Sequence, residues 1–188
     1  GFLTMAGTGL VTGTGSYGNV RVDSTGVVTA GNVTIAGSLD IRRGRLDVSA
    51  GTVRVSGNAT LGGGTLTGSS GILDVDGSVA ATGTALTAAT APPTILCAGD
   101  WLADQAFQPE TGLIVLDGAG PATTRIGSIG GPIYFHAMTV RNGVRVIDTP
   151  VHIETRAGGL QVPKVVVEPG GELRVTNRLR MSCWSLEN

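Results

Sequence analysis

Aromatic residues make up only 4% of this sequence, and cysteine occurs only twice in 188 residues. Two cysteines cannot build a disulfide framework, and no C-x-x-C pair or His/Cys cluster predicts a zinc site. A disulfide between Cys97 and Cys183 is compatible with the sequence, but nothing in the sequence supports it. No apolar run approaches the roughly 20 residues of a membrane helix, so we expect no membrane span. The formal net charge of −1 gives no electrostatic basis for binding nucleic acid.

Glycine, in contrast, is abundant, with 31 residues against a usual share of roughly 7%. These glycines do not recur at every third position, which excludes a collagen helix. The hydrophobic fraction is 41% and the mean hydropathy is +0.25, values that argue against a disordered chain. The composition therefore predicts a folded protein with an aliphatic core and many turns.

Short pairs of apolar residues at i and i+2 recur from residue 33 onward, which is the pattern of strands with one inward face. Consecutive pairs lie only about six or seven residues apart, so no helix fits between them. The pairs also repeat with a period of twenty residues. The positions that we expect to stack in the core are Val33, Ile35, Leu39, Ile41, Leu46, Val53, Val55, Leu61, Leu66, Leu73, Val75 and Leu86.

Glycines follow the same step and are expected at the corners between the strands, where a positive φ or a close backbone approach is needed. The corner positions are Gly31, Gly37, Gly44, Gly51, Gly57, Gly64, Gly71 and Gly77. An antiparallel meander would not require one fixed offset for both glycines and apolar pairs. The pattern therefore predicts an all-β parallel β-helix, or β-solenoid, with three-sided coils of about 20 residues. By the rule for parallel crossovers we expect right-handed winding.

The register breaks in the middle of the chain, where residues 98–112 show no alternating pattern. We therefore divide the chain into a regular solenoid block at 1–90, an insertion at 91–132 and a continuing solenoid block at 133–188. The insertion contains Trp101 and Phe107, which we interpret as an aromatic plug in a wider coil. A linker between two separately ended blocks is the alternative.

A resemblance to a known group of proteins rests on four runs of this segment, Ala98-Gly-Asp-Trp101, Phe107-Gln-Pro-Glu-Thr-Gly112, Leu113-Ile-Val-Leu-Asp-Gly118 and Phe135-His-Ala-Met-Thr-Val-Arg-Asn142. They are similar to the G-x-W…F-x-P-x-x-G-x-V…F-x-x-L-x-V-x-N repeat of bacterial cell-surface and secreted β-solenoid proteins. The resemblance covers roughly residues 98–147. It departs from the repeat at Met138, where leucine is usual, and at Ile114 and Leu116, which flank the usual valine position. The resemblance implies a fold and a surface location, and it carries over no catalytic residue.

Three outward residues form a speculative surface site. The twenty-residue step places Arg54 beside Asp74, which predicts an ion pair between neighbouring coils. Asp74 with Asp76 is a carboxylate pair that could bind calcium or act on a polysaccharide. Aspartates are common on solvent-facing strands, however, and the calcium-binding G-G-x-G-x-D repeat is absent. Because His136 and His152 also lack the spacing of a triad or metal site, we predict no catalytic residue, no metal and no cofactor.

The expected function is structural and not enzymatic. Stacked parallel strands make a stiff rod, and the open ends of a solenoid are sheet edges that template further pairing. We expect an extracellular fibre, stalk or adhesin shaft on a bacterial surface or in its matrix, self-assembling head to tail into filaments. Its partners would be copies of itself, other matrix components or a polysaccharide. The alternative is a carbohydrate-binding or carbohydrate-cleaving β-helix protein that uses outward Asp and Arg residues.

Overall fold

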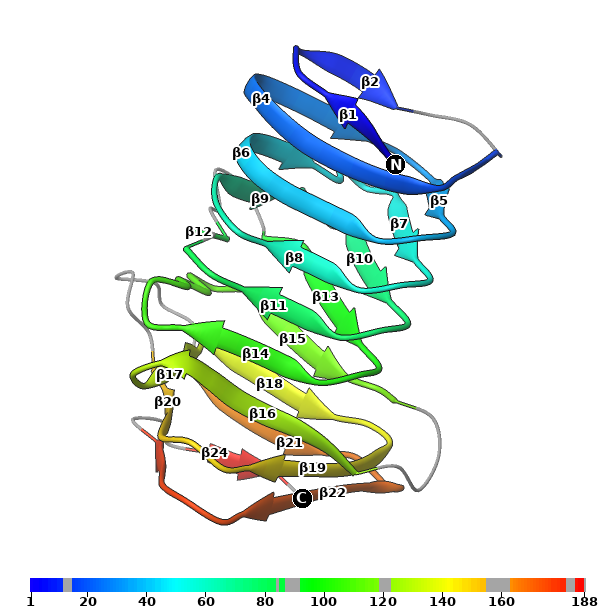
Figure 1. The fold of residues 1–188 in the computed structure, drawn as a ribbon. Helices are drawn as coiled ribbons and strands as arrows, with labels where there is room; N and C mark the ends of the chain where they lie inside the picture. Colours follow the sequence, from blue (N-terminus) through cyan, green and yellow to red (C-terminus); the bar gives the residue numbers. More distant parts are fainter. Residues whose placement is uncertain are drawn as a thin grey trace.

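Successive turns of the backbone stack into a rod in the computed structural model, with the two marked termini at opposite ends (Figure 1). The structure describes residues 1–11, 15–83, 85–86, 92–118, 123–154, 163–181 and 185–187. These residues form no helix, and their strands pair in parallel as a β-solenoid of about seven turns. Among them there is accordingly no long apolar helix of the kind that crosses a bilayer. The predicted fold class, an all-β parallel β-helix, is confirmed.

The strands lie on three faces of the coil. The first face follows one path through a 12-stranded sheet and carries the outward charges discussed below. Its strands are β1 (Phe2–Met5), β4 (Asn19–Ala30), β6 (Leu39–Asp47), β8 (Ala59–Leu61), β11 (Val79–Ala81), β14 (Trp101–Asp104), β16 (Thr123–Gly130), β19 (Gly143–Ile147) and β22 (Gly171–Val175).

The second face begins where the long strands β4 and β6 bend, so that their second halves pair with further short strands of the same sheet. Those short strands are β2 (Gly9–Val11), β9 (Thr65–Thr67) and β12 (Ala85–Leu86). Farther along the chain, a separate three-stranded sheet takes the same place in the order of the turn. It contains β17 (Ile133–Phe135), β20 (Val151–Ile153) and β23 (Leu179–Met181).

The third face is a 9-stranded sheet that runs along the rod. Because it takes strands from the first to the last described turns, it ties the whole stack together through backbone hydrogen bonds. The strands are β3 (Ser16–Tyr17), β5 (Val33–Ile35), β7 (Thr52–Val55), β10 (Ile72–Val75), β13 (Thr94–Cys97), β15 (Leu113–Leu116), β18 (Ala137–Val140), β21 (Lys164–Val167) and β24 (Ser185–Glu187).

The strand register follows the twenty-residue step of the sequence. Val53 pairs with Val33 on one side and with Leu73 on the other, so like positions stack along the rod. Every predicted core position whose side chain is described is at most 5% exposed, whereas the side chain of Leu86 lies outside the described residues. The inward side chains are mostly β-branched or leucine, which suit a pleated, buried surface. They form one continuous aliphatic core.

The predicted corner glycines lie between strands, except Gly44, which lies at the bend inside β6. Gly44 and Gly64 have φ of +82° and +79°, a left-handed conformation that residues with a Cβ rarely adopt. At another corner, the N–H of Gly57 donates to the carbonyl oxygen of Gly37 at 2.9 Å, and Gly77 donates to Gly57 at 3.2 Å. These glycines let successive corners stack backbone against backbone.

The sheets of the first and third faces continue through the 91–132 segment, because β13, β14 and β15 pair in register with the strands before them. The second face does not continue, since β17, β20 and β23 form a separate sheet. Strand β14 forms in a stretch where the sequence shows no alternation. Its inward residues are Trp101 and Ala103, while Leu102 faces outward and is half-buried. Burial therefore alternates along the strand, but the hydropathy of its residues does not. Trp101 packs against Phe107 and Phe135, with ring centroids 5.5 Å and 5.8 Å apart.

Candidate functional site

The speculative site on the third face is assembled differently from the prediction. Arg54 lies opposite Asp74 in the strand register. Its guanidinium nevertheless contacts Asp76, with Nη2 3.1 Å from Oδ1, so the predicted ion pair of Arg54 with Asp74 is wrong. The side chain of Arg54 is long enough to extend diagonally along the sheet, so its guanidinium contacts the carboxylate that follows β10 and not the residue directly opposite. Both partners are exposed, and an exposed pair contributes about 0–1 kcal/mol.

Asp117, which follows β15, is a residue of this face that sequence reasoning missed. Burial raises the pKa of the Asp117 carboxyl, and the negative charge of Asp74 raises it further. The positive charges of Arg141 and Arg145 oppose this shift. Acid–base chemistry on a glycosidic bond uses two carboxyl groups, one of which has a raised pKa. Asp117 lies within the 91–132 segment, where the twenty-residue step no longer predicts neighbours.

Arg145, on β19, is a buried cation that is 1% exposed. Its Nη1 donates to the carbonyl oxygen of Gly99 at 2.6 Å, and its Nη2 donates to those of Cys97 and Ala98, both at 3.1 Å. Its Nε has no hydrogen-bond partner among the described residues. Burial lowers the pKa of Arg145, but the nearby charges of Asp117 and Asp100 favour its charged form. The guanidinium thus holds the corner at residues 97–99 from within the rod.

Cys97 is a buried free thiol beside this corner. Its Sγ lies 3.5 Å from the carbonyl oxygens of both Gly99 and Asp100. Burial raises the pKa of the thiol to about 12, so it stays protonated and has little nucleophilic character. Cys183 lies outside the described residues.

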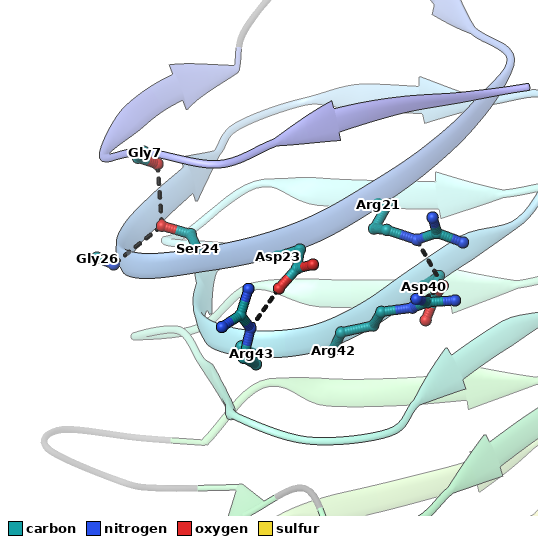
Figure 2. A network of polar contacts seen from close by, with 8 residues as sticks. All are labelled: Gly7, Arg21, Asp23, Ser24, Gly26, Asp40, Arg42 and Arg43. Atoms are coloured by element: carbon teal, nitrogen blue, oxygen red, sulfur yellow. Dashed lines mark hydrogen bonds and ion pairs between the residues drawn. The ribbon is translucent and has the colours of Figure 1, made fainter.

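Arginine and aspartate side chains form a network on the outside of the first face, near its first described turns (Figure 2). One carboxylate oxygen of Asp40, Oδ2, accepts hydrogen bonds from Nε of Arg21 and Nε of Arg42, both at 2.9 Å. Arg43 pairs with Asp23 on the neighbouring strand, and its hydrogen bond lowers the pKa of the Asp23 carboxyl. The network joins β4 to β6 across the outer surface.

A surface hollow of ≈ 550 Å³ lies beside this network, and we call it the Arg42 hollow. The ring of Phe2 lines it and packs against Arg21, whose Cζ is 4.3 Å from the ring centroid. Its other lining residues come from β6 and β8 and from the residues that flank these strands, and they include Ser38, Asp40, Arg42, Asn58 and Thr60. Nothing in the twenty-residue pattern marks this hollow, because it depends on side-chain size and not on hydropathy.

No cluster of three or more potential metal-ligating side chains occurs in the described part of the chain. His136 is buried, and the ring of His152 packs edge-on against Tyr134 at 5.1 Å. His136 lies between β17 and β18, and His152 lies on β20. Neither forms a metal site with the residues that the structure describes.

No protein-family model, no curated protein and no solved structure matches this chain. The resemblance of residues 98–147 to bacterial surface repeats therefore stays a prediction.

Proposed function

We propose that this chain is an extracellular structural protein, a rigid β-solenoid shaft or stalk on a bacterial surface or in its matrix. The observation that carries the proposal is the continuity of the stack. One 9-stranded sheet and one path through the 12-stranded sheet run along the rod, over a single aliphatic core. In such a stack the backbone hydrogen bonds lie along the rod axis and resist separation of the turns.

The outward charges support the same role, because several of them join neighbouring turns. Arg21 pairs with Asp40, and Arg141 pairs with Glu168 at 3.0 Å, in each case between neighbouring turns. Each of these surface pairs contributes little alone. Because they recur along the rod, together they oppose separation of neighbouring turns.

Head-to-tail assembly is part of the proposal. Leu3 and Leu10 are exposed in the first described turn, and Val175 is exposed on β22 near the other end of the rod (Figure 1). Sheet edges with exposed apolar side chains template pairing with another strand. In a filament, the neighbouring copy would cover these residues.

Two measurements test the proposal. Electron microscopy of the purified chain at high concentration should show filaments as wide as one rod, whereas a uniform population of single rods would overturn the head-to-tail assembly. Limited proteolysis tests the shaft itself. We expect the solenoid turns to survive protease concentrations that degrade an ordinary globular domain, and rapid cleavage throughout the strands would contradict a shaft role.

A second candidate function, polysaccharide cleavage on the third face, is favoured by the raised pKa of Asp117, to which the charge of Asp74 contributes. Release of reducing ends from a panel of polysaccharides would test it, with Asp74→Asn and Asp117→Asn as the loss-of-function variants. Asp76→Asn is the control, since Asp76 is held by Arg54. If the unaltered chain releases no reducing ends, this candidate is rejected.

A further inference from the structure

The Arg42 hollow presents hydrogen-bonding groups that other described residues leave unused. Arg42 uses only its Nε, toward Asp40, so both terminal nitrogens of its guanidinium have no partner within the described chain. The Oδ1 of Asn58 accepts from the N–H of Ser78 at 2.9 Å, which orients the amide and leaves Nδ2 as a donor. The hydroxyl of Thr60 adds a donor and an acceptor to the lining.

The charge of the hollow is positive. Arg21 and Arg42 share the single carboxylate of Asp40, and both bonds end on the same oxygen. The neighbouring pair of Arg43 and Asp23 is neutral as a unit. One positive charge is therefore uncompensated. Arg42 is the more exposed of the two arginines that bind Asp40, with 54% of its side chain exposed against 23% for Arg21.

The hollow also has an apolar wall. Phe2 lines it, and the Arg21 guanidinium stacks on the ring at 4.3 Å and restrains it. Gly62 contributes no side chain to the lining, which leaves space above the sheet. The negative face of an aromatic ring attracts the polarised C–H groups of a ligand. The volume of ≈ 550 Å³ lies within the usual range for small-ligand sites, about 300–1,000 Å³.

We propose that the Arg42 hollow binds a pyranose unit bearing an anionic group, as found in acidic polysaccharides. The anionic oxygens lie on the terminal nitrogens of Arg42, the sugar hydroxyls bond Asn58 and Thr60, and one ring face packs against Phe2. A uronate carboxylate and a sugar sulfate share this chemistry. The proposal goes beyond the shaft role, since a shaft needs no ligand and this binding needs no filament.

Affinity measurements by isothermal titration calorimetry, with three polymers as probes, test the proposal. We expect polygalacturonate, dextran sulfate or both to bind, and neutral dextran to bind at least tenfold more weakly. Binding of polygalacturonate alone identifies a carboxylate ligand, and binding of dextran sulfate alone identifies a sulfate ligand. Equal binding of neutral dextran, or no binding of either anionic polymer, overturns the proposal.

Variants locate the binding on the rod. Arg42→Gln should weaken binding about tenfold, the effect of losing a charged hydrogen bond. The matched control is Arg174→Gln, because Arg174 also lies on the first face, has 55% of its side chain exposed and pairs with an acid, Glu172. Equal weakening by both variants would show a general attraction to the charge of the rod and would overturn the assignment.

A third variant separates hydrogen bonding from charge. Thr60→Val keeps the shape and the charge of the hollow and removes one hydroxyl, so affinity should fall several-fold. Circular dichroism on each variant establishes that the fold is intact before affinities are compared. Unchanged affinity in both Thr60→Val and Arg42→Gln, with the fold intact, places any binding elsewhere and overturns the proposal.

Discussion

The guanidinium of Arg145 donates a 2.6 Å hydrogen bond to the carbonyl oxygen of Gly99, a residue 46 positions earlier in the chain. The two residues are brought together because β14, β16 and β19 are consecutive strands of the first face. A buried charge is tolerated only where polar groups replace its hydration, and the carbonyl oxygens of this corner do so. This contact fastens the irregular middle of the rod to the turns that follow it.

Replacing Arg145 with methionine should destabilise the fold by about 1–3 kcal/mol, because carbonyl oxygens at the corner lose their buried donor. The free energy of unfolding in urea measures the effect. Arg174→Met, at an exposed arginine on the same face, should change it by no more than about 0.5 kcal/mol. If the two variants are equally stable, Arg145 does not hold the corner.

Gly118 leaves the space that the Arg145 guanidinium occupies. A Cβ at this position would lie 2.8 Å from Nη2 of Arg145 and would also clash with the carbonyl oxygen of Ala98. Gly118→Ala should therefore cost about 1–3 kcal/mol, as overpacking does. Gly130→Ala is the control, since a Cβ there meets no atom within 4 Å. Thermal unfolding of the two variants compares them directly, and a similar loss in both would contradict the close-packing explanation.

Asp117 should make stability depend on pH. Because its pKa is raised above the usual 3.8 in the folded state, the folded chain binds this proton more tightly than the unfolded chain does. The stability from that proton is complete below pH 3.8 and is lost as the pH rises through the folded-state pKa. Asparagine imitates the protonated carboxyl at every pH. The free energy of unfolding of Asp117→Asn, relative to that of the unaltered protein, should therefore increase from pH 3 to pH 7 by the free energy that corresponds to the pKa shift.

Urea unfolding at the two pH values measures this gain. Asp148→Asn serves as a comparison, because it removes an exposed carboxylate that pairs with Arg125. A stability difference between Asp117→Asn and the unaltered protein that stays constant from acid to neutral pH would show that Asp117 titrates normally.

Cys97 should be inert in the folded protein, because its thiol is buried and its pKa of about 12 keeps it protonated. In a Cys183→Ser variant, a thiol reagent such as DTNB at pH 8 should label Cys97 only after denaturant unfolds the chain. The rate of labelling in native buffer is the measurement. Fast labelling without denaturant would mean that the corner at residues 97–99 opens readily.

The regular turns could be predicted because each has the same number of residues. When coils of equal length stack, residues one period apart become neighbours, so Val33, Val53 and Leu73 fall in one column without further information. Leu102 shows where this inference ends. It is a large apolar residue on the outward side of β14, with Ala103 inward, so its strand carries no hydropathy signal.

The sequence by itself therefore determined the architecture: the coil length, the corners and the aliphatic core. Only the tertiary structure decided the polar contacts. Arg54 reaches Asp76 because a flexible side chain selects its partner in three dimensions. Arg145 binds backbone carbonyl groups, which every residue has and no sequence pattern reveals. The period of burial can be read from the order of the residues. Which acceptor a long side chain reaches is decided only when the turns are stacked.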